Sequence, residues 1–449
     1  MIKVITYGTY DLLHHGHVRL LERAKALGDY LIVGVTSDDF DKTRGKINVQ
    51  QSLEERVAAV RATGVADKVI IEEYEGQKID DIRKYGVDIF TVGSDWIGHF
   101  DYLNEYCKVV YLPRTEGISS TELRDQKRLI KVGLVGYEKY LNKVYKECQF
   151  VNGVRINGVC TQNSRELSEE LLSLDTTDSL DELLSKVDAV YIHSHPKYHY
   201  DEMKRALQAG KHVMCESPLA ETERECRELI AMAQENNCVM MDSLRTAYST
   251  AYARMLLLIK GGKIGEVVSI DATCTSLRTN SAVSGEKWGS MPAWGPTALL
   301  PIFQILGTGY SDVKITSRCE NDRSVDVFSK IDITYPKAVA TVKVGTGVKS
   351  EGELVIAGTQ GYIYVPAPWW KTDYFEIRYE NPEENRRYFY QLDGEGIRYE
   401  WVSFLKMINA FAEGKAEESA YIDNIDRSVS LAIARVMEQF NNGIDVKYI

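Results

Sequence analysis

The 449-residue sequence predicts an α/β protein with two doubly wound parallel sheets followed by a large, mostly antiparallel sheet. Short apolar runs alternate with amphipathic segments over the first 125 residues, and the alternation restarts at residue 130. From Gly265 onward the character changes, because strand-like runs then predominate. We place three domains at residues 1–128, 129–248 and 249–449, in agreement with roughly 150 residues per domain.

The first domain is expected to consist of strands joined by helices. Its strands are expected at residues 3–7, 30–36, 68–71, 89–92 and 108–111, and its helices at 17–27, 53–62 and 79–85. Strands separated by helices indicate parallel βαβ units, which bind ligands at the carboxyl ends of their strands.

The two later domains differ from each other in their strand pattern. Strands at 130–136, 155–160, 189–193 and 212–215 predict a second doubly wound sheet. Strands at 267–275, 325–335, 338–344, 353–357 and 362–365 predict the antiparallel sheet, and helices are expected near 401–412 and 423–440.

The composition excludes several classes of protein. With 54 basic and 65 acidic side chains the net charge is −11, which argues against binding to nucleic acid or a membrane surface. Insertion into a membrane is not expected, because no apolar run approaches the ~18 residues that span a bilayer. The eight cysteines show no C-x-x-C pair, and the N-terminus lacks a signal-peptide pattern. We therefore expect a cytoplasmic protein with reduced thiols and no bound structural metal.

The sharpest chemical signal is an H-x-G-H motif, in which His14, Gly16 and His17 follow the first strand and precede a helix. Helix N-termini attract phosphates, and Gly16 lets the backbone approach a ligand closely. Both imidazoles can donate hydrogen bonds to one phosphate as negative charge builds on it. Incidental histidines in a turn are the alternative, but the strand–turn–helix context favours the functional interpretation.

Two further segments suit a bound anion. Arg44 and Lys46 follow the second strand, although a solvated basic loop would look the same. Arg114 ends a strand, and Ser119 with Glu122 forms a capping box at the start of a helix. This segment is either a second anion cradle or a plain helix cap.

Residues 1–125 resemble the glycerol-3-phosphate cytidylyltransferases, members of the H-x-G-H nucleotidyltransferase superfamily. The stretches that carry the resemblance are 5–9 (ITYGT), 20–25 (LLERAK), 92–96 (VGSDW) and 112–119 (LPRTEGIS). The resemblance implies a Rossmann-like domain, a homo-oligomer (a dimer or larger), and synthesis of CDP-glycerol and pyrophosphate from CTP and glycerol 3-phosphate. It also implies Mg²⁺ bound to CTP, and a role in making cell-surface polymers such as teichoic acid or capsule.

The resemblance also assigns roles to individual residues. It makes His14, His17, Lys46 and Arg114 catalytic. The acceptor phosphate would meet Arg44 and Lys78. The nucleotide would be held by Thr9, Tyr10, His15, Gly16, Thr115, Glu116, Gly117, Ile118, Ser119, Ser120 and Thr121.

Three departures from the family pattern bear on the substrate. His15 stands where the family often has an aromatic residue, and Gly64 where it has a nucleotide-contacting arginine, which Arg61 could replace. Arg44 replaces a lysine, and a planar guanidinium fork differs from a point charge. The acceptor is therefore glycerol 3-phosphate or a similar polyol phosphate.

Residues 129–449 resemble the Gfo/Idh/MocA oxidoreductases. The stretches that carry this resemblance are 130–136 (IKVGLVG), 209–220 (AGKHVMCESPLA), 262–266 (GKIGE) and 358–361 (GTQG). It implies a second Rossmann domain, an α+β domain with an open-faced antiparallel sheet, and an NAD(P) site that begins at Gly136.

Several positions depart from this family's chemistry. Glu138 replaces the middle glycine of the fingerprint, Thr161 the ribose-binding acid, and Ser217 the catalytic lysine. Pro301 and Ile305 replace an Asp-x-x-x-His pair. We therefore expect a degenerate module that serves in oligomerisation or ligand binding. An active NAD(P)-dependent reductase that supplies the polyol phosphate, and a sugar-binding module, are the alternatives.

Two groups of side chains in this module have alternative interpretations. His193, His195 and His199 could bind metal, but no matched carboxylate is evident and a polar cleft is favoured. Four tryptophans could line a sugar pocket, with core packing favoured for at least half of them: Trp288, Trp294, Trp369 and Trp370.

Overall fold

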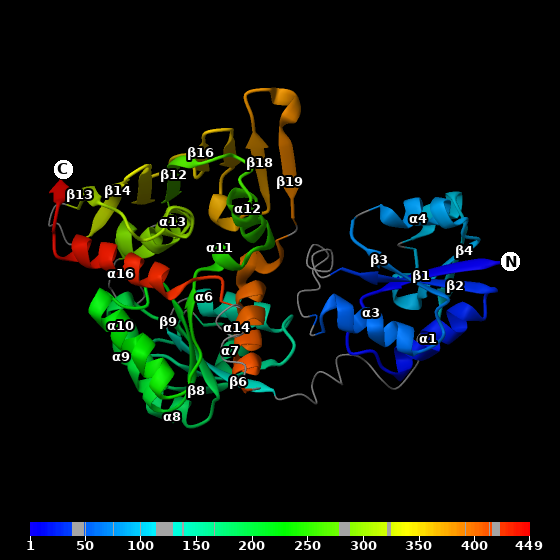
Figure 1. Cartoon of the computed structure of the whole chain (residues 1–449). Helices are drawn as coiled ribbons and strands as arrows, with labels where there is room; N and C mark the ends of the chain where they lie inside the picture. Colours follow the sequence, from blue (N-terminus) through cyan, green and yellow to red (C-terminus); the bar gives the residue numbers. More distant parts are fainter. Residues whose placement is uncertain are drawn as a thin grey trace. The chain divides into compact units, whose positions relative to one another are not determined.

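The structure is a computed structural model of the whole chain. It describes all residues except 38–48, 50, 75, 99, 114–128, 137–138, 166, 278–287, 321–324, 391, 413 and 415–422. The chain divides into two compact units, Met1–Leu129 and Ile130–Ile449 (Figure 1). Within the described residues, no helix has both the length and the apolar character needed to cross a membrane.

The first unit is built on a five-stranded parallel sheet of order β3-β2-β1-β4-β5. Its strands are β1 (Lys3–Gly8), β2 (Tyr30–Thr36), β3 (Lys68–Glu72), β4 (Ile89–Gly93) and β5 (Lys108–Leu112). Helices α1 (His15–Lys25) and α3 (Leu53–Ala62) cover one face, and α4 (Gln77–Tyr85) covers the other (Figure 1). Two short 3₁₀ turns, η1 (Ser94–Trp96) and η2 (Asp101–Glu105), follow β4.

The central strand β1 feeds two separate cores. Val4 packs with Leu21 and Val60 beneath α1 and α3, whereas the next residue, Ile5, packs with Phe90 on the α4 side. All five side chains are fully buried. Burial of each contributes about 1.5–3 kcal/mol, so β1 is a rigid base for the loop that follows it.

The second unit begins with a six-stranded parallel sheet of order β11-β10-β9-β6-β7-β8. These strands are β6 (Ile130–Gly136), β7 (Val154–Cys160), β8 (Asp175–Thr177), β9 (Ala189–His193), β10 (His212–Glu216) and β11 (Met240–Ser243). The helices that follow them are α6 (Tyr140–Cys148), α7 (Glu169–Leu172), α8 (Leu180–Leu184), α9 (Pro196–Gln208), α10 (Glu223–Glu235), α11 (Arg245–Tyr248) and α12 (Thr250–Lys260). The strand order reverses between β6 and β9, where Gly136 pairs with His193. Sheets of this kind bind ligands at such a switch point.

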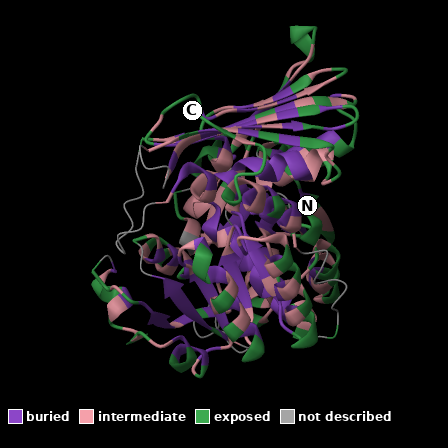
Figure 2. Ribbon diagram, turned by 90° about the vertical axis from the view of Figure 1, so that its left-hand side faces the viewer, coloured by how far each residue is buried: buried purple, intermediate pink, exposed green. Residues whose placement is uncertain are grey.

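A nine-stranded sheet completes the second unit, in the order β19-β18-β17-β16-β12-β15-β14-β13-β20. Its strands are β12 (Val267–Ser276), β13 (Asp312–Cys319), β14 (Asp326–Thr334), β15 (Val339–Thr346), β16 (Leu354–Gly358), β17 (Tyr362–Val365), β18 (Tyr374–Arg378), β19 (Arg386–Phe389) and β20 (Val446–Tyr448). Pairing is antiparallel except for β12–β15 and β13–β20, so the expected mostly antiparallel sheet is confirmed. Figure 2 shows the sheet above the helices, with buried and exposed residues alternating along its strands.

Three long helices accompany this sheet. Helix α13 (Ser290–Leu306) packs against β12, β14 and β15 and also against α16 (Arg427–Asn441). Helix α14 (Ile397–Ala412) packs against α6 of the parallel sheet. Helix α16 also packs against α10, so contacts between helices join the two sheets of the second unit.

Candidate functional site

The loop between β1 and α1 carries the H-x-G-H motif on an unusual backbone. Tyr10 and Leu12 have positive φ angles of 53° and 48°. Non-glycine residues in the left-handed region cost on the order of 1 kcal/mol each and persist only where their surroundings hold them. The loop is therefore fixed by its contacts rather than by its own preference.

His14 and His17 hold each other in place at the start of α1. His14 Nδ1 accepts the Gly16 N–H (3.0 Å), and His17 Nδ1 accepts the His14 N–H (3.5 Å), so the two histidines form a reciprocal cap. Their rings stack with centroids 4.0 Å apart. Because each Nδ1 is an acceptor, each ring carries its proton on Nε2. Two parallel N–H donors at a helix N-terminus suit a phosphate.

Tyr10 packs behind the histidine pair. Its side chain is 3% exposed, and its ring meets His17 edge to face at 5.7 Å. A Cβ atom at Gly8 would lie only 2.9 Å from that ring, so glycine is needed there. Burial raises the pKa of the Tyr10 hydroxyl. The structure places Tyr10 as a support for His17, while its predicted contact with nucleotide stays a prediction.

Three residues that the motif did not reveal fasten this loop. Arg56 of α3 is fully buried and donates from Nη1 to the carbonyls of Thr9 and Thr36, both at 2.8 Å. Asp11 Oδ1 accepts the Gln51 N–H (3.0 Å), and Gln51 Oε1 accepts the Leu12 N–H (2.7 Å). Arg56 falls three residues after Leu53, on the apolar face of its helix. A charged residue at such a position was the sequence signal that could have indicated a buried structural role.

Lys78 lies at the start of α4, near the carboxyl end of β3. It is 8% exposed and forms an ion pair with Glu72. Its ammonium also lies over the rings of Tyr7 (4.8 Å) and Phe100 (5.5 Å). A lysine paired with a buried carboxylate brings less net charge to a phosphate than the sequence suggested. Its contact with the acceptor stays a prediction.

The other predicted residues of the first unit divide into two groups. Thr9, His15 and Gly16 lie in the described loop and the first turn of α1, where His15 is exposed. The remaining ones lie outside the described residues: Arg44, Lys46, Arg114, Thr115, Glu116, Gly117, Ile118, Ser119, Ser120 and Thr121. Their predicted roles stay predictions.

In the second unit, Gly136 ends β6 at the switch point of the sheet. Its φ is 144°, and a Cβ atom there would lie 2.2 Å from the carbonyl oxygen of His193. The packing of β6 on β9 therefore requires this glycine whether or not a cofactor binds. The ring of Tyr140 packs on His193 (4.6 Å), and Arg245 lies over Tyr140 (5.2 Å). These side chains gather at the point where a dinucleotide would cross.

The described positions that would serve NAD(P) chemistry do not fit it. The Thr161 hydroxyl accepts the Asn163 N–H (3.2 Å) in a local turn and offers no carboxylate to a ribose. Ser217 has no ammonium group, and Pro301 and Ile305 lie within the helix α13. Glu138 lies outside the described residues. We assign no hydride-transfer step to this unit.

Buried acids gather behind the carboxyl ends of β10 and β11. Burial, followed by the charge of Glu216, raises the pKa of Glu400 well above its usual range. Tyr191 donates to Glu216 at 2.5 Å. Burial raises the pKa of Asp242 to about 7. Although burial opposes the effect, neighbouring Tyr140 and Glu216 raise the pKa of Arg245, which stays cationic.

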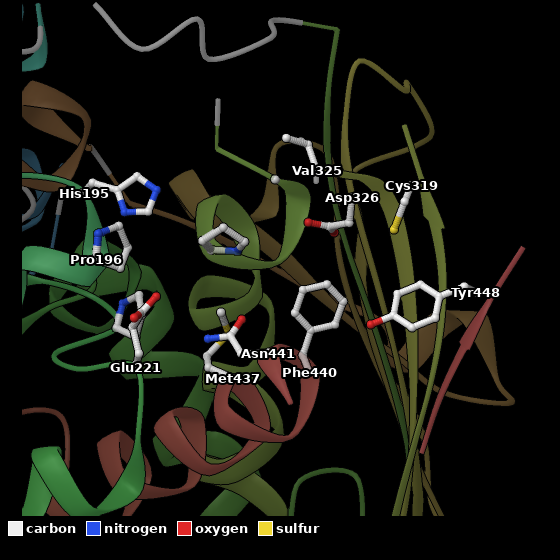
Figure 3. Close-up of a pocket in the computed structure, with 13 residues that line it drawn as sticks. His195, Pro196, Glu221, Cys319, Val325, Asp326, Met437, Phe440, Asn441 and Tyr448 are labelled. Atoms are coloured by element: carbon white, nitrogen blue, oxygen red, sulfur yellow. The ribbon is translucent and has the colours of Figure 1, made fainter. Parts of the chain in front are cut away.

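A cavity of about 280 Å³ lies between the loops after β9 and β10 and the nine-stranded sheet (Figure 3). His195 and Glu221 line one side, and Asp326 and Tyr448 line the other. Its described lining contains two carboxylates and no lysine or arginine. Such a lining disfavours an anionic ligand.

The structure shows where the histidines and tryptophans that were singled out in this unit lie. Both ring nitrogens of His199 lie within 3.0 Å of carbonyl oxygens, and His195 caps α9. No three potential ligand side chains cluster as a metal site in the described ranges. Trp369 is fully buried and donates to Thr273 O (3.0 Å), so it belongs to the core. Trp294 and Trp370 are in ring contact at 4.9 Å.

Comparison with known proteins agrees with the division of the chain into two units. The profile of the cytidylyltransferase-like family matches residues 5–126. Glycerol-3-phosphate cytidylyltransferases of Bacillus spizizenii and Staphylococcus aureus are 52% and 48% identical over 124 and 126 residues, covering 28% of this chain and 95% of each relative. The chain belongs to the cytidylyltransferase-like family. This cytidylyltransferase-like protein is therefore an enzyme, a nucleotidyltransferase, by virtue of its first unit.

The second unit of this cytidylyltransferase-like protein is similar to a different family. Residues 130–243 match the oxidoreductase family with an NAD-binding Rossmann fold. A 3-ketoreductase from Actinomadura kijaniata, in complex with NADP and TDP-benzene, superposes with a TM-score of 0.60 at 19% identity. The match covers 71% of this chain and 99% of the reductase, and it establishes the fold alone.

Proposed function

We propose that the first unit transfers CMP from CTP to glycerol 3-phosphate or a similar polyol phosphate, releasing pyrophosphate and CDP-glycerol or its analogue. The observation that supports this best is the stacked pair of His14 and His17 at the N-terminus of α1. The relatives that are about half identical over the whole unit carry that name. CDP-glycerol would then serve the synthesis of a cell-surface polymer.

In the proposed reaction, an oxygen of the acceptor phosphate attacks the α-phosphorus of CTP. The bond from that phosphorus to the bridging oxygen breaks, and pyrophosphate leaves. The Nε2–H groups of His14 and His17 would bond the α-phosphate oxygens as their negative charge grows. Mg²⁺ bound to the CTP phosphates would neutralise part of their charge, and the triphosphate itself would supply ligands for the ion. Arg56 and Tyr10 would hold the loop in this geometry.

The test is pyrophosphate release from CTP with a panel of polyol phosphates. We expect His14→Ala and His17→Ala each to slow release by about 10²–10³-fold, the effect of losing one donor to a developing charge. Arg19→Ala, an exposed change on the same helix, is the matched control and leaves the rate unchanged. Near-normal turnover in either histidine variant, or no release with any polyol phosphate, contradicts the proposal.

We infer that the second unit has no redox activity and serves oligomerisation or ligand binding. Support comes from Thr161 and Ser217, and from the packing of Tyr140 and His193 at the switch point. An active reductase remains the second candidate, because the fold is that of NADP-bound enzymes. Titration of NAD(H) and NADP(H) into the full chain separates the two, since micromolar binding contradicts a non-redox unit.

All eight cysteines are free, which suits the cytoplasmic location that we also propose.

A further inference from the structure

Three basic side chains of the second unit converge on one carboxylate. Lys143 Nζ lies 2.8 Å from Glu395 Oε2, and Lys371 Nζ lies 3.0 Å from Glu395 Oε1. Arg245 Nη1 lies 3.8 Å from Glu395 Oε2, beyond hydrogen-bond distance. Burial alone would raise the pKa of Glu395, but hydrogen bonds from both lysines lower it to about 2. The carboxylate is therefore ionised at neutral pH.

The loop that carries Glu395 has a strained backbone. The 3₁₀ turn η5 (Asp393–Gly396) places Glu395 at φ 55°, between Gly394 at 57° and Gly396 at 92°. Glycine adopts this region freely and glutamate does not, so the contacts with cations must offset the strain. These side chains are 29–46% exposed, and ion pairs at such positions are weak. The loop is therefore held closed only lightly.

The elements that carry the three cations are held together by contacts that do not involve Glu395. They come from α6, α11 and the 3₁₀ turn η3 (Trp369–Lys371). Thr246 Oγ1 donates to the Trp370 carbonyl at 2.8 Å, which fastens α11 to η3. Arg245 also rests on the ring of Tyr140, 5.2 Å away. Removal of the carboxylate would leave the basic groups facing one another.

We propose that Lys143, Arg245 and Lys371 form a binding site for a phosphate monoester, and that Glu395 occupies this site as a latch when the ligand is absent. A carboxylate has two oxygens and one charge, so it bonds the two lysines and leaves Arg245 out of reach. A phosphate monoester has three terminal oxygens and up to two charges, which match three cations. Entry of the ligand would release Glu395 and its strained turn.

The acids around this site offset its three cations only in part, because Glu147, beside Gly394, is itself paired with Arg398 at 2.5 Å. Burial, followed by the charge of Glu216, raises the pKa of Glu400 well above its usual range, so Glu400 opposes the three cations less than an ordinary carboxylate would. Glu216 accepts a hydrogen bond from Tyr191 and is one of the acids that act on Arg245. In a chain of net charge −11, such a cluster is a local exception. It is distinct from the cavity beside Asp326, whose described lining holds no basic residue.

The experiment is calorimetric titration of inorganic phosphate, then glycerol 3-phosphate, into the full chain and into Glu395→Gln. If the latch is closed about nine-tenths of the time, its loss tightens apparent phosphate binding about tenfold. Lys143→Ala or Lys371→Ala in the Glu395→Gln background abolishes the gain. Lys146→Ala, an exposed lysine one turn along α6, is the matched control and preserves it.

Two results would overturn the proposal. One is phosphate binding to Glu395→Gln that is no tighter than to the unchanged chain, which would make Glu395 only a structural contact. The other is a gain that survives both lysine substitutions. Phosphate binding to the first unit can be separated from binding to this site. The His14→Ala change, made in the Glu395→Gln background, should leave the phosphate binding that depends on Lys143 and Lys371 unchanged. Failure of the cytidylyltransferase proposal is likewise seen separately, in pyrophosphate release.

Discussion

Arg56 illustrates how much of the first site depends on a residue outside the motif. Its guanidinium bonds the carbonyls of Thr9 and Thr36 at 2.8 Å and that of Gln51 at 3.2 Å. These carbonyls belong to the loop after β1, the end of β2 and the entry to α3. A planar fork can serve three acceptors at once, and an ammonium on a flexible stem cannot reproduce that geometry.

We expect Arg56→Lys to lower stability by about 2 kcal/mol, because at least one buried carbonyl loses its donor. Pyrophosphate release should fall more than tenfold, since the histidine loop loses its anchor. Chemical denaturation and the release assay measure the two effects. Glu54→Ala, an exposed change on the same helix, serves as control. Unchanged activity in a destabilised Arg56→Lys variant would show that Arg56 supports the fold without positioning the loop.

The sequence predicted the position of residues whose place in the fold follows from local pattern, while their roles stay predictions. His14, Gly16 and His17 sit at the start of a helix as their spacing indicated. Lys78 was identified by resemblance alone, and its pairing with Glu72 depends on how β3 and α4 pack. Glu395 gave no sequence signal at all, because its three cations lie far away along the chain.

At the scale of elements, the strands and helices of the first unit appear where their apolar periodicity places them, with ends shifted by at most two residues. Helix α13 was not foreseen. It contains Pro296 and Pro301, which ordinarily end helices, and it is apolar on all sides because it lies between the large sheet and α16. Strands β8 and β20 have three residues each, too few to show alternation.

Gly136 shows whether glycine is needed for the packing of two strands or for the binding of a cofactor. Alanine there would place Cβ 2.2 Å from the His193 carbonyl at φ 144°, so we expect Gly136→Ala to destabilise the second unit by about 3 kcal/mol or more. Gly210→Ala is the matched control, because its φ is also positive (69°) but no atom lies within 4 Å. It should cost only about 1 kcal/mol. Equal losses in denaturant titrations would mean that the β6–β9 contact relaxes easily.

At the scale of the molecule, an acidic chain handles anions by concentrating basic groups locally. The net charge of −11 argues against nucleic acid as a partner. It does not indicate where on the protein smaller anions bind. In the second unit a few carboxyl groups, among them Asp242 and Glu400, are buried, and burial raises their pKa. The stability of that unit should therefore depend on pH in a direction opposite to that of salt-bridged proteins.

Four acids of this unit contribute to this dependence: Asp242, Glu202, Asp423 and Glu400, whose pKa burial raises well above its usual range. Burial raises the pKa of Asp242 and Glu202 to about 7 and that of Asp423 to about 6. Between the unfolded pKa near 4 and these values, the native state holds more protons than the unfolded state, so stability falls as pH rises. His199 acts the other way between pH 6.5 and about 4, because burial lowers its pKa, but it is one group against several acids.

We therefore expect the second unit to unfold at lower denaturant concentration at pH 8 than at pH 5, by a few kcal/mol in free energy. Tryptophan fluorescence reports on it, because five of the six tryptophans lie in that unit. Asp242→Asn should flatten the dependence, since an amide takes the place of the protonated carboxyl group beside Ser430 without titrating. Glu235→Gln, exposed on α10, should leave it unchanged. A unit that grows more stable from pH 5 to pH 8 would show that these carboxyl groups ionise in place, which would require solvent or cations to reach them.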